Sequence, residues 1–185
     1  MLAGTNADKI PSSALASSVG VIGSITLDAP AATIGFSNIP QTYRHLRLVL
    51  TANTDEPSVS CGLYLTCNGD TGTNYQYAHE YVWKFSDGSV ARIYQNSYND
   101  TAIFVGEFAA PSKHRSFAAL DIYDYSLAAA TNVQYHNFMS TGSSGQYNRI
   151  GAGIYNPTVA VTSLICDGRF GPYVAGSRAT LYGIS

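Results

Sequence analysis

Apolar and polar residues alternate along much of this chain, and residues 63–83 show the pattern most clearly. Leu63 and Leu65 alternate with Tyr64 and Thr66, and residues 75–83 carry an aromatic or histidine side chain at every second position. A period of two is that of a β-strand, whose successive side chains point to opposite faces. The intervening residues 68–74 are rich in Asn, Asp, Thr and Gly, which favour turns. The stretch therefore predicts a strand, a tight polar loop and a return strand.

The same alternation recurs in short segments from residue 21 onward. Turn-forming residues separate the segments, and none has the 3.6-residue period of a long helix. Further strands are expected at residues 22–27, 32–36, 43–52, 59–66, 101–108, 117–125, 132–139, 149–155, 159–166 and 178–184. Residues 94–100 are polar and aromatic, and we predict a loop there. Many short strands joined by turns predict an all-β fold, an antiparallel β-sandwich of the jelly-roll type.

The alternation also predicts which side chains are buried. With 185 residues the chain is long enough to bury one good core. Leucines occupy one parity of residues 43–52, so that face is expected to point inward. The expected core includes Leu46, Leu48, Leu50, Leu63, Leu65, Leu120, Ile122, Val161 and Leu181.

Residues 1–20 differ from the rest of the chain. They are rich in Ala, Ser, Gly and Asn without a strict period, a composition that cannot build a core. We predict an extended N-terminal arm, residues 1–20, followed by one sandwich domain, residues 21–185. The arm is either disordered or ordered by a neighbouring molecule, and both interpretations stay open. In the second, its apolar side chains dock on a partner: Leu2, Ile10, Leu15 and Val19.

The chain carries little charge. Charged residues make up 12%, and the formal net charge is −2. Nucleic-acid binding needs clustered positive charge, so no nucleic-acid partner is expected. The first residues do not form a secretory signal, and no stretch is long and apolar enough to cross a membrane, so we expect assembly in a cytoplasm and no membrane partner. Hydroxyl and amide side chains must supply the polar surface, which suits sugar contacts and protein assembly.

Aromatic residues with polar tips are the most promising functional set, because they suit interfaces and sugar stacking. The set comprises Tyr75, Tyr77, Tyr81, Trp83, Tyr94 and Tyr98. We favour a core or subunit-interface role for them, and a glycan-facing platform stays open as the alternative. A tyrosine-rich surface with little charge also predicts a closed homo-oligomer, for which we expect a trimer.

The sequence offers no catalytic set, and we predict that the protein is not an enzyme and holds no cofactor or metal. His79 and Glu80 are adjacent in a strand pattern and therefore point to opposite faces. Asp70 and Asn68 fit a turn better than a Ca²⁺ site, because one carboxylate is too few.

The three cysteines are Cys61, Cys67 and Cys166. The first two lie about 20 Å apart if their strand is straight, which is too far for a disulfide. Cys166 pairs with either of them only if the strands meet correctly. We favour buried thiols.

Four segments of the chain resemble a known family. They are residues 36–43 (FSNIPQTY), 65–75 (LTCNGDTGTNY), 122–125 (IYDY) and 175–184 (AGSRATLYGI). Over residues 22–185 the chain is similar to β-sandwich structural proteins of tailed-phage virions, of the capsid decoration (cement) and tail-fibre types. The resemblance implies a virion protein and leaves capsid and tail both open.

Together with the low charge and the arm, the resemblance leads us to expect a capsid decoration protein. It would stabilise the capsid from outside, with the major capsid protein and further copies of itself as partners. The alternative is a tail-fibre or tailspike tip that recognises host surface polysaccharide. The short segment before the sandwich counts against a tip, because tips are usually fused to a long shaft.

Overall fold

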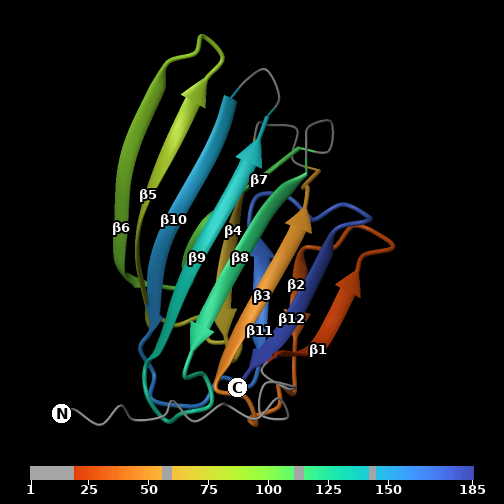
Figure 1. Cartoon of the computed structure of the whole chain (residues 1–185), viewed down its shortest axis with the longest axis vertical. Coiled ribbons are helices and arrows are strands. Elements are labelled where there is room, and N and C mark those ends of the chain that lie inside the picture. Colours follow the sequence, from red (N-terminus) through yellow and green to blue (C-terminus); the bar gives the residue numbers. More distant parts are fainter. Residues whose placement is uncertain (1–18, 56–59, 111–114, 142–144) are drawn as a thin grey trace, which may run out of the picture.

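The computed structural model describes residues 19–55, 60–110, 115–141 and 145–185, which form strands and connections without a helix (Figure 1). The strands are β1 (Val19–Thr26), β2 (Thr33–Phe36), β3 (His45–Ala52), β4 (Ser60–Cys67), β5 (Tyr75–Phe85), β6 (Val90–Asp100), β7 (Ile103–Ala109), β8 (Ser116–Tyr123), β9 (Thr131–Ser140), β10 (Gly145–Tyr155), β11 (Leu164–Gly168) and β12 (Arg178–Ile184). The described part contains no helix able to cross a membrane. The predicted all-β class is confirmed.

The strands form two antiparallel sheets packed face to face. The larger has the order β1-β12-β3-β8-β9-β10-β5-β6, and the smaller has the order β2-β11-β4-β7. The smaller sheet lies behind the larger one in Figure 1, and β5 and β6 extend past it. The antiparallel β-sandwich is thus confirmed. The jelly-roll type is not established. In a jelly roll β8 and β5 would be neighbouring strands, whereas here β9 and β10 lie between them.

The core fills the space between the sheets. Leu46, Leu48 and Leu50 of β3 are at most 1% exposed, whereas Arg47 and Val49 between them face away from the smaller sheet. All nine residues of the predicted core are buried. The leucine parity was therefore a sufficient guide to the inner face of β3.

The connection of residues 68–74 differs from the prediction. It was expected to close a hairpin, but β4 belongs to the smaller sheet and β5 to the larger one. The Tyr75 hydroxyl accepts from the Cys67 amide (3.0 Å) and lies 2.9 Å from the Asp70 carbonyl oxygen, to which it can donate. Asp70 Oδ1 accepts from the Gly72 amide (2.8 Å), which is the turn chemistry expected of Asp70. The segment is a crossover between sheets.

The predicted loop at residues 94–100 is also wrong, since these residues belong to β6. Tyr94 pairs with Glu80 and Asn96 with Ala78 in the β5 ladder. The segment reads as polar because β6 is an edge strand with most side chains exposed. Backbone pairing with β5 outweighs the weak strand propensity of such residues.

Candidate functional site

The outer face of the larger sheet, which points away from the smaller sheet, is hollowed by a shallow trough. Three adjoining hollows of about 730, 370 and 480 Å³ cross β3, β8, β9, β10, β5 and β6 and share lining residues. Their floor is low where the strands carry alanine, at Ala119, Ala152 and Ala78. Ala152 pairs with Ala78 on one side and with Gln134 on the other, so these three form one row across the sheet.

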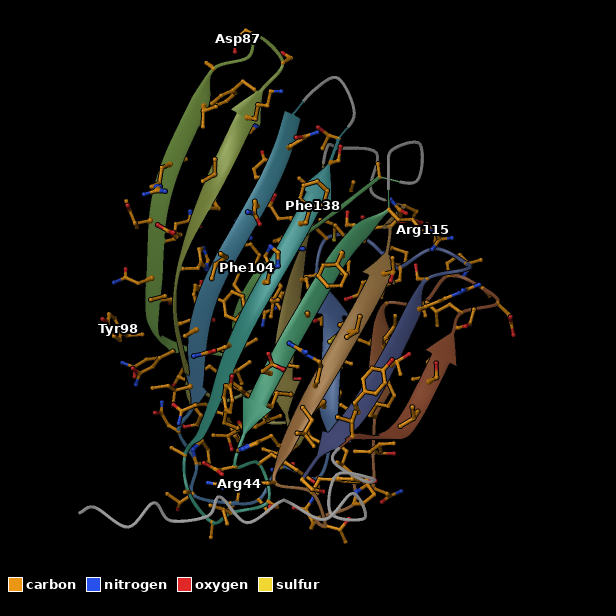
Figure 2. The ribbon with its side chains drawn as sticks, in the orientation of Figure 1. Arg44, Asp87, Tyr98, Phe104, Arg115 and Phe138 are labelled. Carbon is orange, nitrogen blue, oxygen red and sulfur yellow. The ribbon has the colours of Figure 1, made fainter. Side chains whose placement is uncertain are left out.

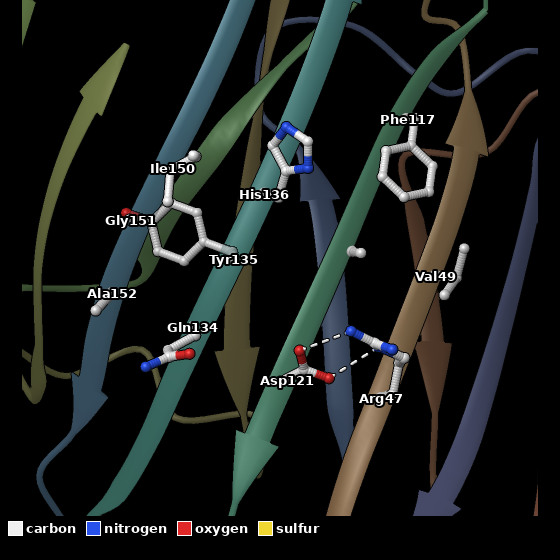
Figure 3. Close-up of a pocket in the computed structure, with 11 residues that line it drawn as sticks. Arg47, Val49, Phe117, Asp121, Gln134, Tyr135, His136, Ile150, Gly151 and Ala152 are labelled. Atoms are coloured by element: carbon white, nitrogen blue, oxygen red, sulfur yellow. Dashed lines mark hydrogen bonds and ion pairs between the residues drawn. The ribbon is translucent and has the colours of Figure 1, made fainter.

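Figure 3 shows the largest hollow, with the side chains of four neighbouring strands converging on it. The charged side chains that line the trough, Arg47, Asp121 and Glu80, are paired. Arg47 Nε lies 2.9 Å from Asp121 Oδ1 and Arg47 Nη2 lies 2.9 Å from Asp121 Oδ2, which is a bidentate pair. Arg92 Nε lies 3.9 Å from Glu80 Oε2 at the β6 side. These pairs leave the trough close to electrically neutral.

Neutral polar groups supply the remaining chemistry of the trough. The Tyr123 hydroxyl donates to Gln134 Oε1 (3.1 Å), which fixes the amide and leaves its NH₂ group for another acceptor. In Figure 3 that nitrogen lies on the Ala152 side of the side chain. His136 Nε2 bonds with Asn148 Oδ1. Sequence reasoning missed this trough, because its residues come from distant strands and become neighbours only through the register.

The six aromatic residues singled out in the sequence do not form one surface. Tyr75 is completely buried and stacks on Tyr155 with a 5.1 Å centroid distance, so it has the core role favoured from the sequence, and the glycan-facing alternative is wrong for it. Tyr94 and Tyr98 of β6 are 69% and 70% exposed, and both line the trough. Figure 2 shows Tyr98 projecting from the β6 side of the molecule.

The other three members, Tyr77, Tyr81 and Trp83, share the parity of Tyr75 and lie on the inner face of β5. Trp83 stacks on Tyr147 with a 4.5 Å centroid distance. Strand parity therefore divides the set into an inner packing group and an outer pair.

A buried polar group also lies on the inner face, around His79. Its Nδ1 lies 3.1 Å from the Tyr135 hydroxyl, and its Nε2 lies 3.1 Å from Gln95 Oε1. A Cβ atom on Gly151 would come within 2.5 Å of both His79 and Tyr135, so glycine is required between them. Burial lowers the pKa of His79 to about 4, with a smaller effect of the same sign from Arg149 and an opposing one from the Gln95 hydrogen bond. The imidazole is therefore neutral at pH 7.

Arg149 is a buried residue that sequence reasoning missed. Its side chain is 3% exposed, and its guanidinium lies 4.7 Å from the Tyr81 ring centroid and 4.5 Å from that of Phe104. Its Nη2 atom is 3.7 Å from Glu107 Oε1, whereas Nε and Nη1 have no hydrogen-bond partner. The alternation of β10 could have indicated its burial, because Arg149 lies on the same face of the strand as the buried Gly153. The aromatic rings hold a cation between the sheets.

The cysteines and the possible metal ligands are the remaining candidates from the sequence. Cys61, Cys67 and Cys166 are buried thiols, as predicted, and burial raises the pKa of Cys67 and Cys166 to about 12. Within the described ranges, no three His, Cys, Asp or Glu side chains are arranged to hold a metal ion.

Of the arm residues expected to bind a partner, only one lies in the described part of the chain. Val19 begins β1 and is 59% exposed, so the first strand begins two residues before the predicted start of the sandwich at residue 21. Leu2, Ile10 and Leu15 lie outside the described residues.

Comparison with known proteins identifies no family. No family model and no curated protein matches the chain. Among solved structures, it is similar to a fructofuranosidase from Schwanniomyces occidentalis in complex with fructosylnystose, at 9% identity and a TM-score of 0.31. The match covers 91% of this chain and 34% of that one. At this TM-score the match has no bearing on function.

Proposed function

We propose that this chain is a non-enzymatic structural protein of a tailed-phage virion, a decoration protein that associates with further copies of itself on the outside of the capsid and stabilises the shell. Two observations support the proposal. Residues 65–75 and 175–184 resemble segments of phage structural β-sandwiches. The sheets also have one edge suited to joining copies of the chain.

The edges of the two sheets differ in how they are protected. Edge strands pair with other chains unless side chains, bulges or shortness prevent it. The smaller sheet ends in β2, which has only four residues, and in β7, where Glu107 bonds with the Asn137 side chain and the Ala109 amide donates to Ser116 Oγ. The larger sheet ends in β1, which carries a bulge after Val21. Each of these three edges resists pairing.

The fourth edge, β6, has no such protection over most of its length, and this observation carries the proposal of self-association. Residues 90–97 pair with β5 in an unbroken register, and no described strand lies on their other side. They contain no proline and one charged residue, Arg92. Exposed Tyr94 adds apolar area beside the open backbone edge. A long, flat edge with few charges is suited to pairing with a second copy.

Two adjacent proline substitutions test this contact. Neighbouring residues of a strand direct their N–H groups to opposite sides, so Arg92→Pro and Ile93→Pro remove one bonded and one open N–H. We expect one variant to lose thermal stability and the other to keep its melting midpoint while falling to monomer mass in light scattering. A monomeric wild type at micromolar concentration would refute self-association, and wild-type mass in both variants would refute the β6 contact.

The oligomer mass from light scattering also gives the number of copies, and with it the symmetry of the oligomer. Two β6 strands joined to each other give a twofold dimer. The trimer expected from the sequence would need β6 to meet a different edge of the next copy, and because the bulge after Val21 makes β1 an unfavourable partner, the β6 contact favours the dimer. The place in the virion is tested by counting copies per particle, since many copies indicate the shell and a few indicate the tail.

A second candidate function is recognition of host surface polysaccharide by a tail-fibre or tailspike tip. The trough favours it, because its exposed tyrosines and amides are groups that bind sugars. A low copy number at the tail would support this candidate over the first.

A further inference from the structure

We propose that the trough binds a neutral oligosaccharide, held by Gln134 and Tyr98 above the alanine floor. The inference rests on the second candidate function and narrows it to a ligand class and to named residues. The trough lies on a face of the larger sheet and the β6 contact lies along its edge, so the two are tested separately.

The charge of the trough indicates the ligand class. Arg47 is engaged by Asp121 in two contacts of 2.9 Å, and Arg92 lies next to Glu80. A polyanion such as an acidic capsule or a nucleic acid requires cations that are available to its charges. A ligand of this trough gains nothing from carrying charge, so the charge pattern favours a neutral molecule.

The polar groups suit sugar hydroxyls. Gln134 accepts from the Tyr123 hydroxyl, so its oxygen is occupied and its two N–H donors remain for a ligand acceptor. Further exposed amides come from Asn132 of the same strand, β9, and from Asn96 of β6. Amides that donate and accept at fixed positions match the hydroxyl groups of a sugar, each of which does both.

The apolar groups suit the faces of sugar rings. Tyr98 is 70% exposed beside the row formed by Ala78 and Ala152, which gives a ring wall next to a low floor. The C–H face of a sugar packs against an aromatic ring while its hydroxyls point to amides. A row of low floor across several strands favours an extended ligand over a single sugar unit.

The test is a screen of the full-length protein against an array that carries neutral hexasaccharides of glucose, galactose and mannose and an acidic hexasaccharide of galacturonic acid, followed by calorimetry with the best probe. We expect binding to at least one neutral probe and no preference for the acidic one. Gln134→Ala and Tyr98→Ala should each weaken that binding by about tenfold or more, the loss expected for one hydrogen bond or one ring contact.

Matched variants separate the trough from general effects. Gln146→Ala removes the same kind of side chain from an exposed position on the outer face of the larger sheet, outside the trough, and should leave affinity unchanged. Tyr98→Phe keeps the ring and should retain most of the binding. Ala152→Leu fills the floor without removing any polar group, and since Ala152 is exposed it should abolish binding at an unchanged melting midpoint.

Each contrary result has its own meaning. Equal binding of acidic and neutral probes, lost in the same variants, would overturn the neutral class and leave polysaccharide recognition standing. Binding that persists in Ala152→Leu would place the sugar elsewhere and overturn the trough. Absence of binding to every probe would overturn both the inference and the second candidate function. A fall in mass of the Ala152→Leu variant in light scattering would overturn both as well, because it would show that a second copy of the chain covers the trough.

Discussion

The side-chain amide of Asn137 bonds to the backbone of Glu107 as a neighbouring strand would. Asn137 Oδ1 accepts from the Glu107 amide (3.0 Å), and Asn137 Nδ2 donates to the Glu107 carbonyl (3.1 Å) and to that of Phe117 (3.0 Å). Asn137 belongs to β9 of the larger sheet and Glu107 to the edge strand of the smaller one. One side chain therefore connects the two layers and occupies an edge that would otherwise be open.

Gly106 makes room for this amide, and we predict that the two positions are energetically coupled. A Cβ atom on Gly106 would lie 2.1 Å from Asn137 Oδ1. Asn137→Ala should lower the free energy of unfolding by about 2–4 kcal/mol, since it leaves buried backbone groups without partners. Gly106→Ala should also destabilise by displacing the amide, and the double variant should lose less than the two single losses together.

Urea unfolding of the four proteins measures the coupling. Asn132→Ala serves as the control, because Asn132 is exposed on the same strand and should change the free energy by at most about 0.5 kcal/mol. Strictly additive losses would show that Gly106 does not act through Asn137.

The sequence predicted the parts of this fold that depend on local alternation. Leu48 is buried and Arg47 is exposed because a strand with one face on the core has no other choice of parity. The strand partners of β4 and β5 were not predictable in the same way. The turn residues 68–74 suit a hairpin and a crossover equally, and partners distant in the sequence decide between them.

The site was less predictable than the core. Ala78, Ala119 and Ala152 lie far apart in the sequence, and only the register of β8, β9, β10 and β5 assembles them into a floor. The aromatic set failed as one surface because Tyr75 and Tyr94 lie on strands whose facing was not known. Composition identified aromatic and amide side chains as the candidates for binding, whereas the strand register decides which face of the sheet each one lies on.

Acid should destabilise the protein through His79. Its pKa is lowered to about 4 in the folded chain, chiefly by burial, and is about 6.5 in an unfolded one. The unfolded state therefore binds the proton more readily, so this contribution to stability is complete above about pH 6.5 and is lost as the pH falls to about 4. The charge of Arg149 also lowers the pKa of His79 and so acts in the same direction.

The measurement is the urea midpoint between pH 7.5 and pH 4 for wild type, His79→Gln and His136→Gln. The His79 variant should lose less stability on acidification than wild type, whatever its stability at pH 7.5. His136 is exposed on the outer face, so its variant should follow wild type. Identical slopes for all three proteins would show that His79 is not the group responsible.

Under the proposed function, deleting residues 1–18 should leave the sandwich intact and weaken attachment to the capsid. β1 begins at Val19 and pairs with β12 from that residue onward, so every described strand is kept in the shortened chain. Leu2, Ile10 and Leu15 would each contribute about 1.5–3 kcal/mol if buried on a partner, less the cost of ordering the backbone. The deletion should therefore keep the thermal midpoint and reduce retention on stripped particles after washing.

A full-length variant with serine at Leu2, Ile10 and Leu15 controls for chain length. It should be lost from particles as readily as the deletion protein. Equal retention of the wild-type and deletion proteins would show that the sandwich itself carries the attachment.

The last prediction concerns the cation buried between the sheets. Arg149→Lys should destabilise by about 1–2 kcal/mol, because an ammonium group cannot stack between Tyr81 and Phe104 as the planar guanidinium does. Arg149→Met should also destabilise, since it leaves the Glu107 carboxylate without its counter-charge. The double variant Arg149→Met/Glu107→Gln should be at least as stable as wild type, because two guanidinium nitrogens are buried without a partner and that desolvation is not recovered. Urea unfolding at pH 7 decides the matter: a double variant less stable by more than about 2 kcal/mol would mean that the ring contacts outweigh the cost of burying the charge.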